Sequence, residues 1–141
     1  MSKSDAFETD LLELLFNATA LTNLARDSAT PDTLYVSLHT GDPADAGTQA
    51  TSETAYTGYA RVNVVRTAGA WTVTSGSVSP VANIDFGECT AAPGAAITHF
   101  GVGTGASGAG YLLYSGTVSP NITMAAGVIP RLKTTSAITE E

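Results

Sequence analysis

The stretch from Ala96 to Val118 constrains the fold of this chain more than any other part of the sequence. Two apolar runs, Ile97–Val102 and Tyr111–Tyr114, lie on either side of a segment that is rich in glycine. β-Branched and aromatic residues bounded by glycine favour strands, and glycine reaches the positive φ angles that tight turns require. The stretch therefore predicts a long antiparallel hairpin at the centre of a β-sandwich. The glycines of its turn are Gly103, Gly105, Gly108 and Gly110.

The run from Gly103 to Gly108 also matches the GxGxxG fingerprint of dinucleotide-binding proteins. In those proteins a helix begins at the glycines and its amide groups hold the pyrophosphate, while an acidic residue about 20 positions later binds the ribose. Here the short apolar run Tyr111–Tyr114 follows, and no Asp or Glu occurs between Glu88 and Glu140. We therefore expect a plain hairpin turn without a cofactor.

Residues 4–17 carry the one strong helical pattern of the sequence. Ser4 can cap the first turn, and Asp5 and Glu8 stand where the helix dipole favours negative charge. The apolar stripe is wider than a solvated helix tolerates, so we expect the helix to be buried. Covering its own β-sandwich is the commoner use of such a face, and burial against another subunit is the alternative. The face carries Phe7, Leu11, Leu14 and Leu15, and Leu12 and Phe16 widen it.

Short runs with strand character fill most of the remaining chain, after a second short helical piece over residues 18–26. About seven to nine short strands with frequent turn signals predict an all-β fold, an antiparallel β-sandwich or jelly roll with one N-terminal amphipathic helix. We expect a single domain over residues 1–141, with a helical segment at 4–26 and a sandwich body at 33–138. Two near-copies, SGSVSP at 75–80 and SGTVSP at 115–120, predict strand ends that a proline stops. The remaining predicted strands are Thr33–Thr40, Tyr59–Val65, Trp71–Thr74, Val81–Phe86, Ile122–Met124 and Ile129–Ile138.

Charged residues are few and unevenly placed. The formal net charge is −7, and residues 1–53 hold nine acidic side chains against Lys3 and Arg26. Because an acidic chain is repelled by phosphate backbones, we expect no nucleic-acid binding. Cys89 is the one cysteine, which excludes an internal disulfide and a cysteine metal cluster. Residues 11–16 are too short for a signal peptide, and no apolar run approaches the roughly 20 residues of a membrane helix, so we expect a soluble protein.

Ser37, His39 and Asp42 lie close in sequence, as members of a catalytic triad can. Ser37 and His39 would stand two positions apart on one strand, with Cβ atoms about 6–7 Å from each other, which disfavours a short Ser–His contact. No glycine-flanked nucleophile elbow surrounds Ser37. We therefore expect a polar strand face and no catalytic residue. His99 is expected to be a hydrogen-bonded side chain at a sheet surface.

Residues 43–57 predict a polar loop longer than most connections in compact domains, and such loops often carry function. Asp42, Asp45 and Glu53 offer oxygen ligands around this loop, but their spacing matches no EF-hand. Calcium or glycan binding there stays an alternative, and we expect no metal site. Trp71 and several tyrosines could stack on sugars, although aromatic residues spread over many strands more often fill a core.

Several sequence segments between about Phe7 and Leu132 follow one another in an order that is typical of one protein family. The combination most specific for that family is LYVSLHTGDP followed by YARV and ITHFGV. In this order the chain resembles a family of small structural proteins of tailed bacteriophages, often labelled tail-fibre-like, which includes capsid cement (decoration) proteins. The matching segments are FETDLLELLFN, LYVSLHTGDPADAGTQATSE, YTGYARV, FGECTA, ITHFGVGTGASGAGYLLYSGTVSP and ITMAAGVIPRL.

The resemblance implies a virion structural protein without enzymatic activity or cofactor. In the cement role, it would be made in the host cytoplasm and bind the outside of the shell of major capsid protein. It would also form a homo-oligomer, a dimer or trimer. The alternative is a tail or tail-fibre component that binds a receptor or glycan.

Three surfaces are expected to contact partners: the helix, the acidic loop Asp42–Glu53 and the tip of the hairpin. The tip consists of alanine and glycine and has little side-chain bulk, so another backbone can approach it closely. The expected contact residues are Phe7, Leu11, Leu14, Leu15, Asp42, Asp45, Gly105, Ala106, Gly108 and Ala109.

Overall fold

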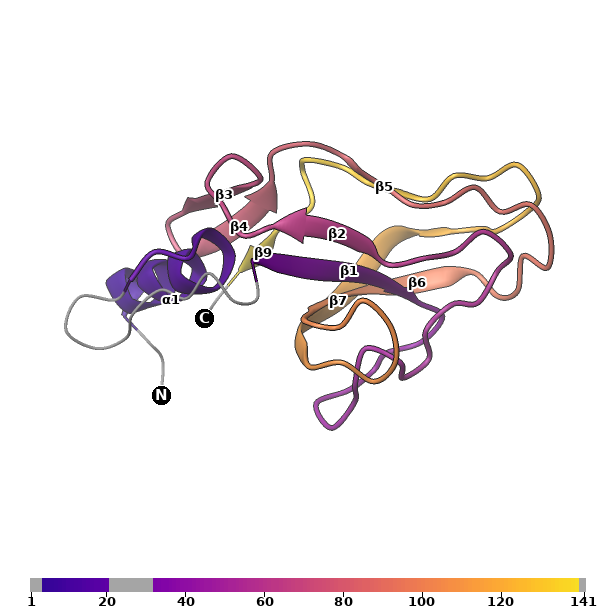
Figure 1. Cartoon of the computed structure of the whole chain (residues 1–141), viewed down its shortest axis with the longest axis horizontal. Coiled ribbons are helices and arrows are strands. Elements are labelled where there is room, and N and C mark those ends of the chain that lie inside the picture. Colours follow the sequence, from indigo (N-terminus) through magenta and orange to yellow (C-terminus); the bar gives the residue numbers. More distant parts are fainter. Residues whose placement is uncertain (1–3, 21–31, 140–141) are drawn as a thin grey trace. The chain divides into compact units, whose positions relative to one another are not determined.

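The computed structural model describes residues 4–20 and 32–139 (Figure 1), and its regular structure is mostly antiparallel β-sheet with one N-terminal helix. This confirms the predicted fold class and is consistent with a β-sandwich. The chain divides into two compact units: the described residues within 1–33, 64–84 and 132–141 form the first, and residues 34–63 and 85–131 form the second. The single domain expected from the sequence stays a prediction. Within the described ranges, no helix is long and apolar enough to cross a membrane.

The first unit contains α1 (Asp5–Asn17), which begins where the sequence predicts. Ser4 caps it, because the Ser4 hydroxyl accepts a hydrogen bond from the Phe7 N–H at 3.4 Å. At the other end, Ala18 takes the left-handed conformation with φ 53°, and the Arg66 guanidinium donates to carbonyl groups of the last turn. Both ends of the helix are therefore satisfied by groups within its own unit.

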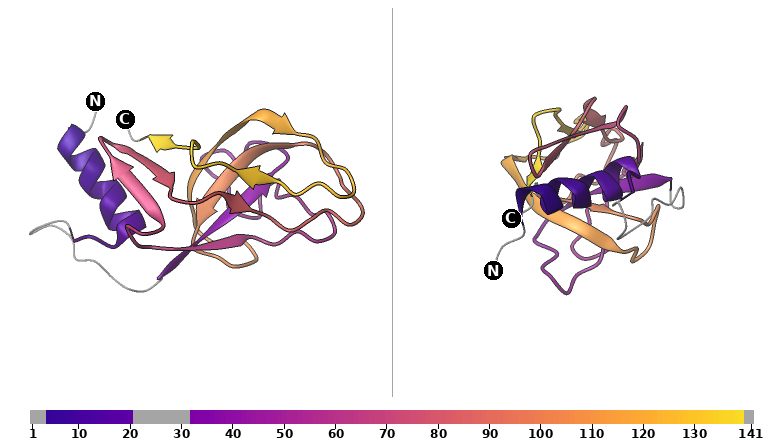
Figure 2. Two further views of the ribbon diagram at one scale, coloured as in Figure 1. Left: turned by 90° about the horizontal axis from the view of Figure 1, so that it is seen from above. Right: turned by 90° about the vertical axis from the view of Figure 1, so that its left-hand side faces the viewer.

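The buried face of α1 packs on β3 (Trp71–Thr74) and β4 (Ser77–Pro80), as Figure 2 shows. Leu12 and Phe16 are fully buried, and the Phe16 ring meets the Trp71 ring edge-on with centroids 4.8 Å apart. The helix therefore covers its own sheet, which confirms the favoured alternative. This sheet has the order β3-β4-β9, with β9 at Ile138–Thr139.

The four-stranded sheet has the order β2-β1-β6-β7. β1 runs antiparallel to β6, with Val36 opposite Val102. Leu34, Val36 and Leu38 are buried on one side of β1, as the alternation predicts. The bounds of these strands are β1 Thr33–His39, β2 Val62–Val65, β6 Ile97–Gly103 and β7 Leu112–Ile122, and the remaining pair is β5 (Ile84–Asp85) with β8 (Arg131–Leu132).

The predicted hairpin is confirmed as β6 and β7, but β7 lies at the edge of its sheet rather than at the centre, and it is much longer than the run Tyr111–Tyr114. The prediction that Pro120 stops this strand is wrong. His99 lies opposite Thr117 whereas Ile97 lies opposite Ile122, so the register shifts and β7 carries extra residues there. Since the proline sits in this irregular part, its missing N–H removes no bond from the regular ladder.

Several other boundaries differ from the prediction. Ser77–Pro80 forms β4, so a strand of its own stands between the runs expected at 71–74 and 81–86. The strands expected over 59–65, 81–86 and 129–138 are shorter than predicted: β2 begins only at Val62, and bends or turns occur within the other two. Pro80 does end its strand, as predicted. Of the second helical piece expected over 18–26, residues 18–20 are not helical, and the rest lies outside the described residues.

Candidate functional site

The long loop (residues 43–57) returns alongside the end of β1, within the second unit. The Thr40 N–H donates to the Ser52 carbonyl at 2.8 Å, and the Thr54 N–H donates to the Leu38 carbonyl at 2.9 Å. These backbone bonds resemble the ladder of an added antiparallel strand. The loop is thereby held in place by β1 and does not stand away from the sheet.

Gln49 joins the long loop to the hairpin tip (residues 104–111). Its side chain is fully buried and donates through Nε2 to the Tyr35 carbonyl at 3.0 Å. Its Oε1 accepts the Gly105 N–H at 2.8 Å, and its own backbone N–H donates to the Ala109 carbonyl at 2.8 Å. A buried amide with its hydrogen bonds satisfied fixes one geometry between the groups that it joins.

The glycines on either side of the tip make room for Gln49. A Cβ atom at Gly103 would lie 2.3 Å from Gln49 Cδ, and one at Gly110 would lie 2.3 Å from Gln49 Oε1. The space beside the backbone at Gly103 and Gly110 is therefore occupied by the Gln49 side chain of the long loop. Gly108, with φ at +69°, has open space where a Cβ would be and remains accessible.

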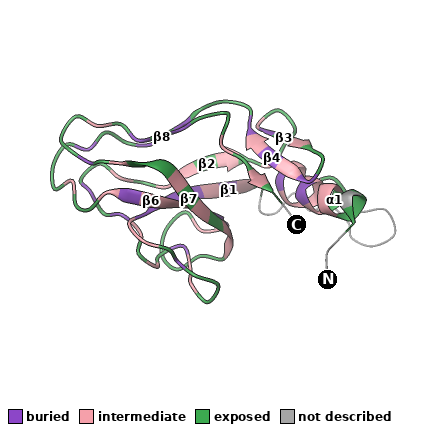
Figure 3. Ribbon diagram, turned by 180° about the vertical axis from the view of Figure 1, so that it is seen from behind, coloured by how far each residue is buried: buried purple, intermediate pink, exposed green. Residues whose placement is uncertain are grey.

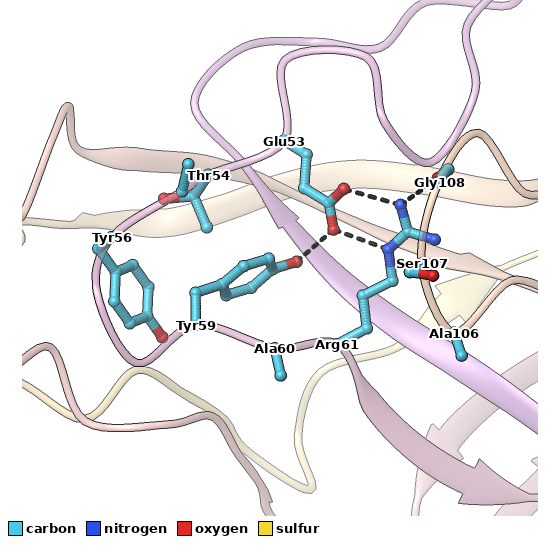
Figure 4. A pocket seen from close by; sticks show the side chains of 10 residues that line it. Glu53, Thr54, Tyr56, Tyr59, Ala60, Arg61, Ala106, Ser107 and Gly108 are labelled. Atoms are coloured by element: carbon cyan, nitrogen blue, oxygen red, sulfur yellow. Dashed lines mark hydrogen bonds and ion pairs between the residues drawn. The ribbon is translucent and has the colours of Figure 1, made fainter.

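Arg61 and Glu53 form the second connection, shown in Figure 4. Arg61 Nε lies 2.7 Å from Glu53 Oε1, and Nη2 lies 2.7 Å from Oε2, so the ion pair is bidentate. The guanidinium also donates to the Gly105 carbonyl at 2.8 Å and to the Gly108 carbonyl at 2.6 Å. The side chains of Arg61 and Glu53 are 2% and 17% exposed. The hairpin tip thus turns its carbonyl groups toward a cation, whereas a nucleotide-binding loop turns amide groups toward a phosphate.

Two tyrosines complete this cluster. The Tyr59 hydroxyl donates to Glu53 Oε1 at 2.7 Å and accepts the Leu38 N–H at 3.1 Å. Burial raises the pKa of Tyr59, and burial raises the pKa of Tyr56 to about 12. The hydrogen bonds that Arg61 donates to the Glu53 carboxylate raise the pKa of Arg61 further above its usual value. At neutral pH the two phenols therefore stay protonated and the guanidinium of Arg61 stays charged.

An open pocket of about 440 Å³ lies between the long loop and the hairpin tip, and many of its lining residues are small. Its ionic groups are already paired to each other, and the Tyr56 hydroxyl donates to the Gly87 carbonyl at 2.8 Å. Such a site suits contact with a neutral surface better than acid–base chemistry. The lining residues are Glu53, Thr54, Ala55, Tyr56, Tyr59, Ala60, Arg61, Ala106, Ser107 and Gly108.

Ser37 and His39 do contact each other, and the prediction against a short contact is wrong. Ser37 Oγ lies 2.8 Å from His39 Nε2. The reason lies in the neighbouring strand, where Gly101 stands opposite Ser37. A Cβ at Gly101 would lie 2.7 Å from both side chains, so its absence lets the serine and histidine converge over β6.

The Ser37–His39 pair is buried and is not part of a triad. His39 Nδ1 lies 2.8 Å from the Thr51 carbonyl, which only accepts hydrogen bonds, so Nδ1 carries the proton and Nε2 accepts from Ser37. Both side chains are fully buried, and burial lowers the pKa of His39. Asp42 is exposed and instead accepts the Ala44 N–H at 2.9 Å. The pair therefore holds the long loop on β1.

The residues expected to contact partners are divided between the two compact units. Phe7 is 40% exposed and the leucines of the same helix face are half-buried, all in the first unit. In the second unit the structure brings the tip beside Arg61, while the two loop aspartates are exposed. No three His, Cys, Asp or Glu side chains gather into a metal site in the described ranges. The half-buried residues are Leu11, Leu14, Leu15 and Gly105, and the exposed ones are Asp42, Asp45, Ala106, Gly108 and Ala109.

Sequence reasoning missed the three side chains that organise the site: Gln49, Tyr59 and Arg61. One signal was present, because Arg61 is the only Lys or Arg between Arg26 and Arg66 and follows soon after the acidic loop. A lone cation in a neutral strand segment often has a buried partner.

Comparison with known proteins gives one match that spans almost the whole chain. The model of a family described as Podophage GP4 fiber I protein gp80 matches residues 2–139. No curated protein gives a significant match.

Proposed function

The chain belongs to the Podophage GP4 fiber I protein gp80 family, and from that premise we propose that it serves as a fibre subunit of a podophage particle. Membership in this family makes it a tailed-phage structural protein and a component of the virion. In the proposed role it catalyses no reaction and works by docking to neighbouring virion proteins.

The observation that carries the proposal is the fixed position of the hairpin tip. Gln49 and Arg61 hold the tip through buried hydrogen bonds, while Ala106, Gly108 and Ala109 stay exposed. A surface that is ordered before it binds loses less conformational entropy on binding. Small neutral side chains also leave no charge to desolvate. These two properties favour the tip as a docking surface for another protein.

An assembly of such subunits is stabilised by the many weak contacts that the subunits make at the same time. A single tip offers a small contact area, and small interfaces between proteins are usually weak. In a particle, each subunit is held by neighbours at the same time, so modest contacts act together at high effective concentration. The proposal thus needs no single tight interface.

Purified particles provide the test of the fibre role. We expect quantitative mass spectrometry to find a few to a few dozen copies per particle, and particles that lack this protein to lose fibre density while their shells remain unchanged. Hundreds of copies together with missing density on the shell would overturn the fibre role.

A capsid cement role is the second candidate. The combination of LYVSLHTGDP, YARV and ITHFGV, which resembles a group that includes decoration proteins, favours it. In that role the protein would bind the outside of the major capsid protein shell and stabilise it. Copy number separates the two roles, since a shell-covering protein is present in hundreds of copies.

A further inference from the structure

The open pocket of about 440 Å³ between the long loop and the hairpin tip has no occupant in the proposed function. Its volume lies within the range of small-molecule sites, about 300–1,000 Å³, and admits an aromatic side chain. On the side of the tip it is lined by Ala106, Ser107 and Gly108, which are exposed (Figure 3). A protein that docks on the tip therefore lies directly beside the pocket.

The charged groups that line the pocket disfavour a charged occupant. Glu53 and Arg61 both line it, and their bidentate pair brings a carboxylate and a guanidinium together with no net charge. An anion in the pocket would meet Glu53 and a cation would meet Arg61, and placing like charges together is costly. Among the described residues, no other Asp, Glu, Lys or Arg lines the pocket. An uncharged occupant therefore fits this pocket best.

The carboxylate of Glu53 keeps one position for a hydrogen-bond donor. A carboxylate offers about four lone-pair positions. Glu53 Oε1 accepts from the Tyr59 hydroxyl and from Arg61 Nε, whereas Oε2 accepts only from Arg61 Nη2 among the described residues. The Glu53 side chain is 17% exposed and that of Arg61 is 2% exposed. An occupant of the pocket therefore reaches the carboxylate more readily than the guanidinium, and it gains most if it donates a hydrogen bond.

Much of the remaining lining is apolar or aromatic. Ala55, Ala60 and Ala106 contribute methyl groups, and the rings of Tyr56 and Tyr59 form an edge-to-face pair with centroids 5.4 Å apart. A further aromatic ring packs favourably beside such a pair. A sugar fits less well, because several of its hydroxyl groups would lose water where few polar groups replace it.

We propose that the pocket takes one uncharged aromatic side chain with a hydrogen-bond donor, a tyrosine or a tryptophan, from the virion protein that docks on the tip. The ring packs beside Tyr56 and Tyr59, and its O–H or N–H donates to Glu53 Oε2. Tyrosine and tryptophan are among the residues that most often dominate the energy of protein interfaces. This inference rests on the proposed function, because it names the partner group that binds beside the same docking surface.

Titration of the full chain with soluble probes, followed in two-dimensional amide NMR spectra, tests this chemistry. N-acetyltyrosinamide carries the proposed group, and N-acetylphenylalaninamide differs from it only by the missing hydroxyl. We expect the tyrosine probe to shift the signals of Ala55, Ala60 and Ser107 to saturation and to bind about tenfold more tightly than the phenylalanine probe, because a hydrogen bond to a charged acceptor is a strong one. Equal binding of the two probes, tighter binding of N-acetyllysinamide, or no shift at millimolar concentration of the tyrosine probe would overturn the proposal.

Two variants assign the binding to the pocket. Ala60→Phe adds a ring at a residue that lines the pocket and should abolish binding of the tyrosine probe. Ala68→Phe, at an exposed alanine outside the lining, is the matched control and should leave binding unchanged. Loss with both variants or with neither would contradict the assignment, and the two probes on the unmodified chain decide the question if Ala60→Phe does not fold. Copy number and particle density measure the fibre role without any probe, so the two proposals can fail separately.

Discussion

Replacing Arg61 by methionine is the sharpest perturbation of the connection between the long loop and the hairpin tip. The change keeps much of the apolar stem and removes the bidentate pair with Glu53 together with the bonds to the Gly105 and Gly108 carbonyls. Among the described residues it leaves the Glu53 carboxylate with only the Tyr59 hydroxyl as partner, in a site where the Glu53 side chain is 17% exposed.

Removing one partner of a buried ion pair costs about 3–5 kcal/mol, because the other charge stays buried. We therefore expect Arg61→Met to lower the free energy of unfolding by about 3 kcal/mol or more, measured by urea denaturation. The double variant Arg61→Met/Glu53→Gln should recover part of the loss, since no unpaired charge then remains.

A matched control exists in the same unit. Arg131 and Asp85 form an equally bidentate pair, but their side chains are 52% and 45% exposed. Exposed pairs contribute little, so Arg131→Met should leave the unfolding midpoint almost unchanged. Equal effects of Arg61→Met and Arg131→Met would refute the reasoning, because burial would then not decide the strength of these pairs.

Three further changes test other parts of the structure. Gly103→Ala should destabilise the chain by about 1–3 kcal/mol in urea denaturation, because the new Cβ meets Gln49, whereas Gly69→Ala, with only one atom at 3.7 Å, should not. The pKa of His39 is lowered by burial, so the unfolded chain binds more protons below about pH 6.5, and stability should fall as the pH drops below that value. His39→Gln should flatten this pH dependence in urea denaturation at pH 5 and pH 7, and an unchanged slope would exclude His39 as its cause. Phe16→Ala should lower the unfolding free energy by about 3–5 kcal/mol, whereas Phe7→Ala, at a residue that is 40% exposed, should have a much smaller effect, and calorimetry would distinguish the two.

Local patterns were sufficient to predict α1, β1, β3 and the turn between β6 and β7. In each of them the signal lies within a few residues: the cap at Ser4, the alternation from Leu34 to Leu38, and the glycines that bound the tip. Such signals act through backbone preferences and side-chain periodicity, which the sequence shows directly.

The arrangement of the site could not be predicted in the same way, because it depends on residues far apart in the chain. Arg61 and Gly105 are 44 positions apart, and Gln49 and Gly105 are 56 positions apart. The Ser37–His39 contact depends on Gly101, which is brought opposite Ser37 only by the register of β1 and β6. The length of β7 depends on a register shift beside Pro120, which no local pattern reveals.

The glycines of the tip show that one sequence pattern can have two different structural causes. Glycine indicates that something approaches the backbone closely, but the sequence does not say what. At Gly103 and Gly110 the neighbour is Gln49 of the same chain, whereas the exposed residues Ala106, Gly108 and Ala109 remain available to a partner. The tip as a subunit contact therefore stays a prediction, now limited to these three residues.

A localised cryo-electron microscopy reconstruction of purified particles tests the central claim most directly. The claim is that this chain is a fibre subunit that docks through a hairpin tip held by Gln49 and Arg61. We predict density for the chain at a fibre position, with Ala106, Gly108 and Ala109 against a neighbouring protein. Density on the shell alone, or a fibre position in which the tip faces solvent, would contradict it.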